Sequence, residues 1–371
     1  MNDSTEQLSE YSPAFQWFGG KARVASVVWD ALGDVESYTE PFFGSGAMLF
    51  LRPPSHTGER REQVNDFDGF VANFWRAVKA DPEGVASYCD WPCNEIDMTA
   101  RHAWLVSQAV AHKERMLADP EYFDAKIAGW WCWGQCWWIG GGWCDGKGPW
   151  SVKDGVFGKH GTRPGVSSRR PHLGDDGQGV NRPQVRAIGT VADYGYHPMT
   201  MPELLRWFQF LSARLRHVRI LNGDWRRAVT GGAAMTLPVR MQPDGAVGIF
   251  LDPPYADTAD RTDGLYAHDS LSVAHDVREW AIGAAKNKKW RIVLAGFDGE
   301  HDELHERHGW RVIEWYRAGF LKGGMGNTAG TDEDGTVGHV QHKERLWLSP
   351  GCLVTAKERP EQQQQLFGGA A

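Results

Sequence analysis

Residues 38–51 read YTEPFFGSGAMLFL, and this stretch decides the fold. Its first half, through Phe43, has the composition of a short strand, which two glycines, Gly44 and Gly46, bring to an end. Helical spacing resumes at Ala47, and a second strand and a second helix follow before residue 80. Strands that alternate with helices in this way predict an α/β fold with a parallel sheet wound on both faces.

The alternation returns in the second half of the chain after an interruption. From about residue 85 to 200 the apolar periodicity is largely lost, apart from one helix predicted near 98–116. Beyond it we predict helices at 202–215 and 271–285, and strands at 218–221, 247–251, 291–294, 311–316 and 343–348. The chain therefore divides into a first core part (1–85), an inserted domain (86–200), a second core part (201–352) and a disordered tail (353–371).

Composition limits the class of protein. The chain has 371 residues, a formal net charge of -7 and six cysteines, which suits one large α/β domain with a smaller inserted one. The N-terminus is polar and acidic, and the chain lacks a run of about 18 apolar residues, so we predict a cytoplasmic protein without a membrane partner. The net charge argues against a general polyanion binder, but DNA affinity depends on local charge.

The turn from Glu40 to Gly46 has the form of a nucleoside cradle. A strand ends, glycines let the backbone approach a ligand closely, and a helix begins. Asp66, at the end of the next predicted strand, is suited to accept hydrogen bonds from both hydroxyls of a ribose. Each feature also has an ordinary structural interpretation, which is a sharp turn for the glycines and a helix N-cap for Asp66.

The tetrapeptide Asp252-Pro253-Pro254-Tyr255 directly follows the apolar run at 247–251. Two prolines fix φ and remove two backbone donors, so the carbonyls there have no competing amide. The Asp252 carboxylate and the Pro253 carbonyl can accept both N–H bonds of one amino group, and Tyr255 offers a face on which a base can stack. Accepting both bonds localises the nitrogen lone pair for attack on a sulfonium methyl. A proline turn capped by Asp252 is the alternative for the tetrapeptide alone.

Four motifs, taken in order, resemble those of the Dam-like (D12-class) adenine-N6 DNA methyltransferases. They are Trp17-Phe18-Gly19-Gly20-Lys21, Glu40 to Gly46, Asn65-Asp66, and Asp252 to Tyr255. In that family a target-recognition domain lies between the cofactor motif and the catalytic tetrapeptide, and the middle of this chain, which resembles nothing specific, occupies that position. The resemblance implies a doubly wound, Rossmann-like methyltransferase sheet with an inserted target-recognition domain.

The resemblance also implies a cofactor, S-adenosylmethionine, and residues that contact it. Trp17 and Lys21 would lie at its methionine end, Asp66 at its ribose and Asp224 at its adenine amino group. The full expected cofactor-binding set is Trp17, Lys21, Glu40, Phe43, Gly44, Gly46, Asp66, Asp224 and Asp252, and the expected catalytic residues are Asp252, Pro253 and Tyr255. The family often has a DNA-contacting lysine where this chain has Gln16, so the recognised DNA sequence does not transfer.

The expected activity is transfer of a methyl group to N6 of an adenine flipped out of double-stranded DNA. Two alternatives are an amino-methyltransferase acting on cytosine N4 or on RNA, and a DNA-binding relative that has lost catalysis. Cytosine-N4 enzymes usually carry serine at the position of Asp252, and lost catalysis would be expected to damage the motifs, which are intact here.

The inserted segment combines tryptophans with basic residues. Nine of the 19 tryptophans fall between Trp91 and Trp150, and they either build a small core or form a DNA-facing platform, of which we favour the core. A basic stretch follows, whose arginines suit phosphates and guanine edges, unless it is a solvated loop. The expected DNA-binding residues are Lys159, Arg163, Arg169, Arg170, Arg182 and Arg186.

Two further features have competing interpretations. Cys132, Cys136 and Cys144 invite a zinc site, but paired Cys-x2-Cys spacing is missing, so we expect buried free thiols and no metal. Gln363 to Phe367, in the glutamine-rich tail, resembles the short peptide by which bacterial proteins dock on the DNA polymerase sliding clamp. An unstructured tail with two chance apolar residues is the alternative.

Overall fold

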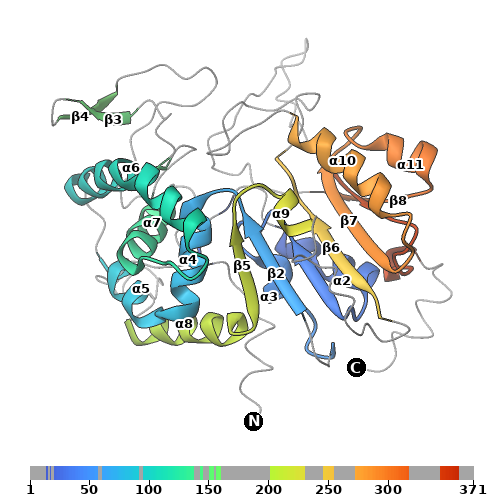
Figure 1. Ribbon diagram of the computed structural model, residues 1–371, viewed down its shortest axis with the longest axis horizontal. Coiled ribbons are helices and arrows are strands. Elements are labelled where there is room, and N and C mark those ends of the chain that lie inside the picture. The colour runs from blue at the N-terminus through green and yellow to red at the C-terminus, as the bar shows by residue number, and fades with distance from the viewer. Residues whose placement is uncertain are drawn as a thin grey trace, which may run out of the picture.

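A computed structural model gives the architecture of the chain (Figure 1). It describes residues 14–15, 17, 21–56, 61–91, 95–137, 143–144, 150–153, 156–159, 201–229, 245–254, 272–316 and 343–358. Within these ranges the protein is α/β, with helices on both faces of a seven-stranded, mostly parallel sheet. The predicted fold class is thereby confirmed at this level, and the sheet is compatible with a Rossmann-like fold.

The main sheet has the order β5-β2-β1-β6-β7-β9-β8. Its strands are β1 (Ser37–Glu40), β2 (Arg61–Asp66), β5 (Val218–Asn222), β6 (Val247–Leu251), β7 (Trp290–Phe297), β8 (Arg311–Tyr316) and β9 (Lys343–Leu348). Numbered along the chain within this sheet, the order is 3-2-1-4-5-7-6. Strand β9 is antiparallel to both of its neighbours, and the other adjacent strands are parallel.

The interior strands explain why two helical layers form. Successive side chains of a strand face opposite sides of the sheet. In β6, Ile249 and Leu251 therefore pack into one core, whereas Phe250 packs into the other, and all three are buried. A strand covered on both faces reads as a continuous apolar run, which is the pattern from which the sequence predicts β6.

Helices divide between the two faces of the sheet. One face carries η2 (Ala22–Val24), α2 (Ala25–Leu32), α3 (Ala47–Phe50), α4 (Gly69–Ala80), α5 (Pro82–Cys89), α6 (Glu95–Ala118), α7 (Ala125–Trp137) and α8 (Met201–Leu215). The other face carries α9 (Arg226–Val229), α10 (Val273–Ala284) and α11 (Asp302–His308). Asp68 caps α4 by accepting a hydrogen bond from Phe70 N at 2.8 Å, so the helix begins at Gly69.

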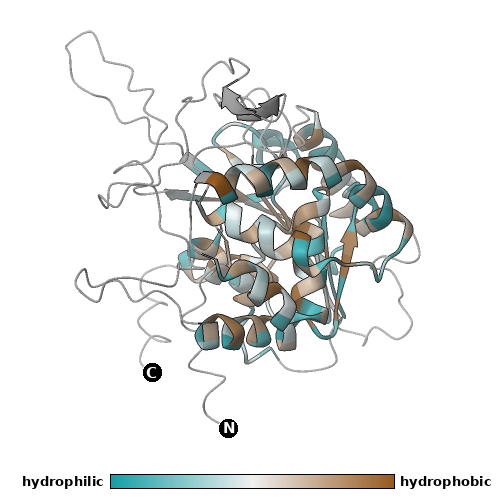
Figure 2. Ribbon diagram, turned by 90° about the vertical axis from the view of Figure 1, so that its left-hand side faces the viewer, coloured by the Kyte–Doolittle hydropathy of each residue, from teal (hydrophilic) through white to brown (hydrophobic). Residues whose placement is uncertain are grey.

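Helix α7, which carries part of the tryptophan-rich segment, lies in the helical layer at the left of Figure 1, the side that faces the viewer in Figure 2. Helix α7 packs against α4 and α5, and its Trp131 and Trp133 are almost fully buried. The core interpretation is therefore confirmed for these two side chains. The boundary predicted at residue 86 falls inside α5, and the helices through residue 137 share the core of the sheet domain. The hairpin of β3 (Trp150–Lys153) and β4 (Val156–Lys159) forms a separate two-stranded sheet.

The ordered part of the chain extends past the end predicted at residue 352. Leu353 N donates to Ala31 O at 2.8 Å, and Arg311 Nε lies 2.7 Å from Glu358 Oε1, beside the short η4 helix (Ala356–Glu358). The first six residues of the predicted disordered tail are therefore ordered. Among the helices that the structure describes, none has the length and apolar character needed to cross a membrane.

Candidate active site

Four strand ends meet at one edge of the main sheet. Parallel strands share a direction, so the ends of β1 at Glu40, β2 at Asp66, β5 at Asn222 and β6 at Leu251 lie along the same edge. Strands β1 and β6 are neighbours in the sheet. The next strand after β1 along the chain, β2, lies on the far side of β1 from β6, and the next strand after β6, β7, lies on the far side of β6 from β1. This is the switch point of a doubly wound sheet, which is where such folds bind ligands.

The Gly44 turn after β1 is held from three directions. Gly44 N donates to Asp66 Oδ2 at 2.9 Å, and Gly44 O accepts from Trp75 Nε1 at 2.9 Å. Its φ is +47°, and a Cβ at this position would overlap the indole of Trp17. Gly46 also has a positive φ, of +78°, and lies against the rings of Phe43 and Phe50. The turn therefore requires glycine for conformation and for space.

Asp66 supports this turn with both carboxylate oxygens. Besides Gly44 N, it accepts a hydrogen bond from Asp68 N at 2.9 Å. Enclosure by the turn, followed by the negative charge of Asp68, raises the pKa of Asp66 to about 7, although the backbone hydrogen bonds oppose the shift. A group with this pKa changes charge near neutral pH. The N-cap of α4 is Asp68 and not Asp66, so the alternative interpretation of Asp66 as a helix N-cap is wrong.

Two asparagines in the last residues of β2 and β5 tie the strand ends together. Asn65 Nδ2 donates to Pro41 O and to Gly223 O, both at 3.0 Å. Asn222 Nδ2 donates to Asp66 O at 2.9 Å. Both asparagines are buried, so these bonds fix the relative positions of the ends of β1, β2 and β5.

Asp252 lies at the end of β6 in contact with Lys21. Lys21 Nζ is 3.0 Å from Asp252 Oδ1 and 3.6 Å from Glu344 Oε2. The side chain of Asp252 is 22% exposed, whereas those of Lys21 and Glu344 are 4% and 3% exposed. Pro253 is buried beneath it, and Tyr255 lies outside the described residues. Two predicted residues from distant segments are thus in contact, and Glu344 joins them from a strand to which the sequence assigns no role.

Glu40 is turned toward the interior of the domain. It is 3% exposed, and Tyr38 Oη donates to its Oε2 at 3.0 Å. Burial, and then the charges of Asp252 and Asp66, raise the pKa of Glu40 well above its usual value. The carboxyl group therefore favours its protonated form, and it supports β1 from below the turn.

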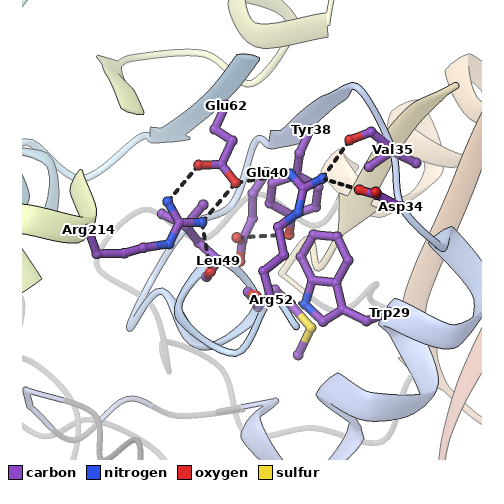
Figure 3. Close-up of polar contacts among 10 residues, drawn as sticks. Trp29, Asp34, Val35, Tyr38, Glu40, Leu49, Arg52, Glu62 and Arg214 are labelled. Carbon is purple, nitrogen blue, oxygen red and sulfur yellow. Dashed lines mark hydrogen bonds and ion pairs between the residues drawn. The ribbon is translucent and has the colours of Figure 1, made fainter. Parts of the chain in front are cut away.

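A largely buried ionic network of Arg52, Glu62 and Arg214 lies beside the Tyr38–Glu40 pair (Figure 3). Glu62 accepts from Arg52 Nη1 at 3.0 Å and from Arg214 Nη1 and Nη2 at 2.6 and 2.8 Å. Arg214 Nη2 also donates to Leu49 O at 3.2 Å, and Arg52 lies over the ring of Trp29. Burial alone would raise the pKa of Glu62, but the hydrogen bonds and charges of both arginines outweigh it and lower the pKa. The network joins α8 and β2 to α3.

Asp224 lies at the same edge but is paired with a neighbour. Its carboxylate is 3.2 Å from Arg226 Nη1 and accepts from Arg226 N at 2.8 Å. Arg226 in turn contacts Asp276 at 2.8 Å. Nearly half of the Asp224 side chain is exposed, so a ligand can approach it.

Several predicted residues lie outside the part of the chain that the structure describes. They are Arg163, Arg169, Arg170, Arg182, Arg186 and the segment 363–367. The backbone of Lys159 ends β4. Cys132 and Cys136 are buried free thiols, as expected, and Cys89 and Cys144 are buried as well. Within the described ranges, no three or more His, Cys, Asp and Glu side chains are grouped so that they could hold a metal ion.

Neither a scan against protein-family models nor a search of curated proteins found a match to this chain.

Proposed function

We propose that this protein is an S-adenosylmethionine-dependent DNA methyltransferase that methylates N6 of adenine. The observation that carries the proposal is the convergence of Gly44, Asp66 and Asp252 at the switch point of the sheet. A turn suited to a nucleoside and an acceptor suited to an amino group therefore lie at adjacent strand ends, although they come from distant segments of the chain.

The sheet supports the finer assignment to a Rossmann-like methyltransferase core interrupted by a target-recognition domain. Its order differs from the dinucleotide-binding order 3-2-1-4-5-6 by one reversed strand, β9, between β7 and β8. The chain between α7 and α8 has the length and basic composition for a recognition domain.

The chemistry of the crevice fits S-adenosylmethionine. Each carboxylate oxygen of Asp66 accepts one hydrogen bond from a backbone N–H group. The lone pairs that remain on these oxygens suit the hydroxyl groups of a ribose. The partly exposed Asp252 carboxylate brings negative charge to this edge of the sheet, which favours a sulfonium ligand. When bound, the cofactor supplies an activated methyl group on that sulfonium.

Asp252 and Pro253 would act on the target amino group. The partly exposed Asp252 carboxylate accepts one N–H bond and the Pro253 carbonyl accepts the other, which localises the nitrogen lone pair. The strand behind them is paired on both sides, so the acceptors are held rigidly when the base enters. Unstacking and unpairing that base costs a few kcal/mol, and stacking on Tyr255 would offset part of it.

The proposal is tested by chemical identification of the methylated base. Double-stranded DNA free of N6-methyladenine is incubated with the protein and S-adenosylmethionine, digested to nucleosides and examined by mass spectrometry. We expect N6-methyladenine from the wild type and from Asp30→Asn, an exposed control on α2, but none from Asp252→Ala, which should still bind DNA. N4-methylcytosine would favour the alternative substrate, and unmodified DNA would refute the activity.

DNA binding is the second part of the proposal. The basic stretch beyond β4 carries the arginines expected to contact phosphates, so binding should weaken steeply with salt. Neutralising Arg163, Arg169 and Arg170 should make the dependence of log K on log salt less steep by about 2–3, because each lost phosphate contact removes close to one unit. An unchanged slope would count against this stretch.

A further inference from the structure

Glu344 is a buried carboxylate beside Asp252 that belongs to none of the motifs predicted from the sequence. It is the second residue of β9, which runs antiparallel to β7, and it pairs with Phe297 at the end of β7. The start of β9 therefore lies at the same edge of the sheet as the end of β6. Glu344 reaches Lys21 from that side, and its side chain is 3% exposed.

We propose that Glu344 is a positioning residue, which shares Lys21 with Asp252 and so keeps Asp252 a strong acceptor for the target amino group. This inference rests on the proposed methyltransferase function. The distances support it, because Lys21 Nζ lies 3.0 Å from Asp252 and 3.6 Å from Glu344. The exposures support it as well, since Asp252 alone of the three is accessible to a substrate, with 22% of its side chain exposed.

The charges explain why sharing matters. If Asp252 were the sole carboxylate beside Lys21, the ammonium would neutralise it and weaken its hydrogen bonds to an incoming amino group. A second carboxylate 3.6 Å from Lys21 Nζ takes up part of that positive field. The interaction is strong because both Lys21 and Glu344 are shielded from water and salt. Asp252 thus stays anchored but retains negative charge while the attacking nitrogen becomes positive in the transition state.

The test is the kinetics of Glu344→Gln, which keeps the shape of the side chain and removes its charge. We expect kcat to fall on the order of tenfold, while the Michaelis constants for DNA and S-adenosylmethionine change by less than about twofold, because the lost effect acts in the transition state. Glu344→Asp retains the charge but holds it farther from Lys21, so it should recover part of the loss and leave kcat below the wild-type value. The matched control is Glu314→Gln on β8, where the glutamate is 53% exposed and pairs with Arg345 at 2.9 Å.

The outcomes separate this role from a structural one and from the function on which it rests. Wild-type kcat in Glu344→Gln, or raised Michaelis constants that Glu344→Asp does not restore, would overturn the positioning role alone. If Glu344→Gln is too unstable to assay, Glu344→Asp decides, because a smaller kcat with unchanged Michaelis constants supports the role and any other result overturns it. Failure of the wild type to form N6-methyladenine would overturn both proposals.

Discussion

Asp66 gives the candidate cofactor site a dependence on pH close to neutrality. Its carboxyl group has a pKa of about 7, because enclosure by the Gly44 turn disfavours the charged form. With that pKa, roughly one-tenth of the molecules carry the carboxylate at about pH 6 and nine-tenths at about pH 8. If the ribose hydroxyls bind the carboxylate form, the affinity for the cofactor should rise roughly tenfold over this interval, or about 1.4 kcal/mol.

Calorimetric titration of S-adenosylhomocysteine at constant ionic strength measures this change directly. Asp66→Asn is the control, because an amide has no charge to gain, and its affinity should vary much less with pH. The effect on folding has the opposite sign. A carboxyl pKa raised by folding means that the stability from this group is present below its unfolded value and is lost as the pH rises through about 7. Equal wild-type affinities at both pH values, or the same slope in Asp66→Asn, would refute the reasoning.

Two further substitutions test the parts of the structure that support the site. Glu62→Gln should lower the free energy of unfolding in urea by about 3–5 kcal/mol, because the buried Arg52 and the partly buried Arg214 lose the carboxylate they share. A loss below about 1 kcal/mol would mean that the network stabilises no more than a surface pair does. Gly44→Ala should lower the melting temperature by about 2–4 °C or more, since a left-handed alanine costs about 1–2 kcal/mol before its overlap with Trp17. An unchanged melting temperature, or unchanged binding of S-adenosylhomocysteine, would contradict the role given to this turn.

The sequence predicts the sheet core well because each interior strand carries its own signal. The run 247–251 is apolar throughout, as a strand covered on both faces must be, and a polar residue or glycine follows β5 at Gly223, β6 at Asp252 and β7 at Asp298. The first strand is shorter than its apolar run suggests and stops at Glu40, because Pro41 has no N–H group to continue the ladder. The position of β9 between β7 and β8 has no local signal, since it depends on pairing between distant segments.

The parts of the site that the sequence misses are charged residues with distant partners. Glu344 stands near the start of a strand where a charge suggests a solvent-facing position, and only the folded chain brings it to Lys21. Arg52, Glu62 and Arg214 are likewise scattered, so nothing local distinguishes them from surface residues. A charged side chain can be buried only where another side chain of opposite charge lies beside it. That partner comes from a distant part of the chain, so the neighbouring sequence does not reveal it.

The adjacency of β1 and β6 has a consequence for how the protein is made. Thr39 lies between Gln63 and Ile249, so one edge of β1 is completed early in synthesis and the other much later. At about 5–20 residues per second, a ribosome needs roughly 10–40 s to reach the second partner. During that interval the edge of β1 that will pair with β6 is an unpaired strand edge, which is open to aggregation or to chaperones. The residue proposed to act on the target base therefore arrives directly after the strand that closes this edge, so that one late folding step both protects the nascent chain and completes the candidate active site.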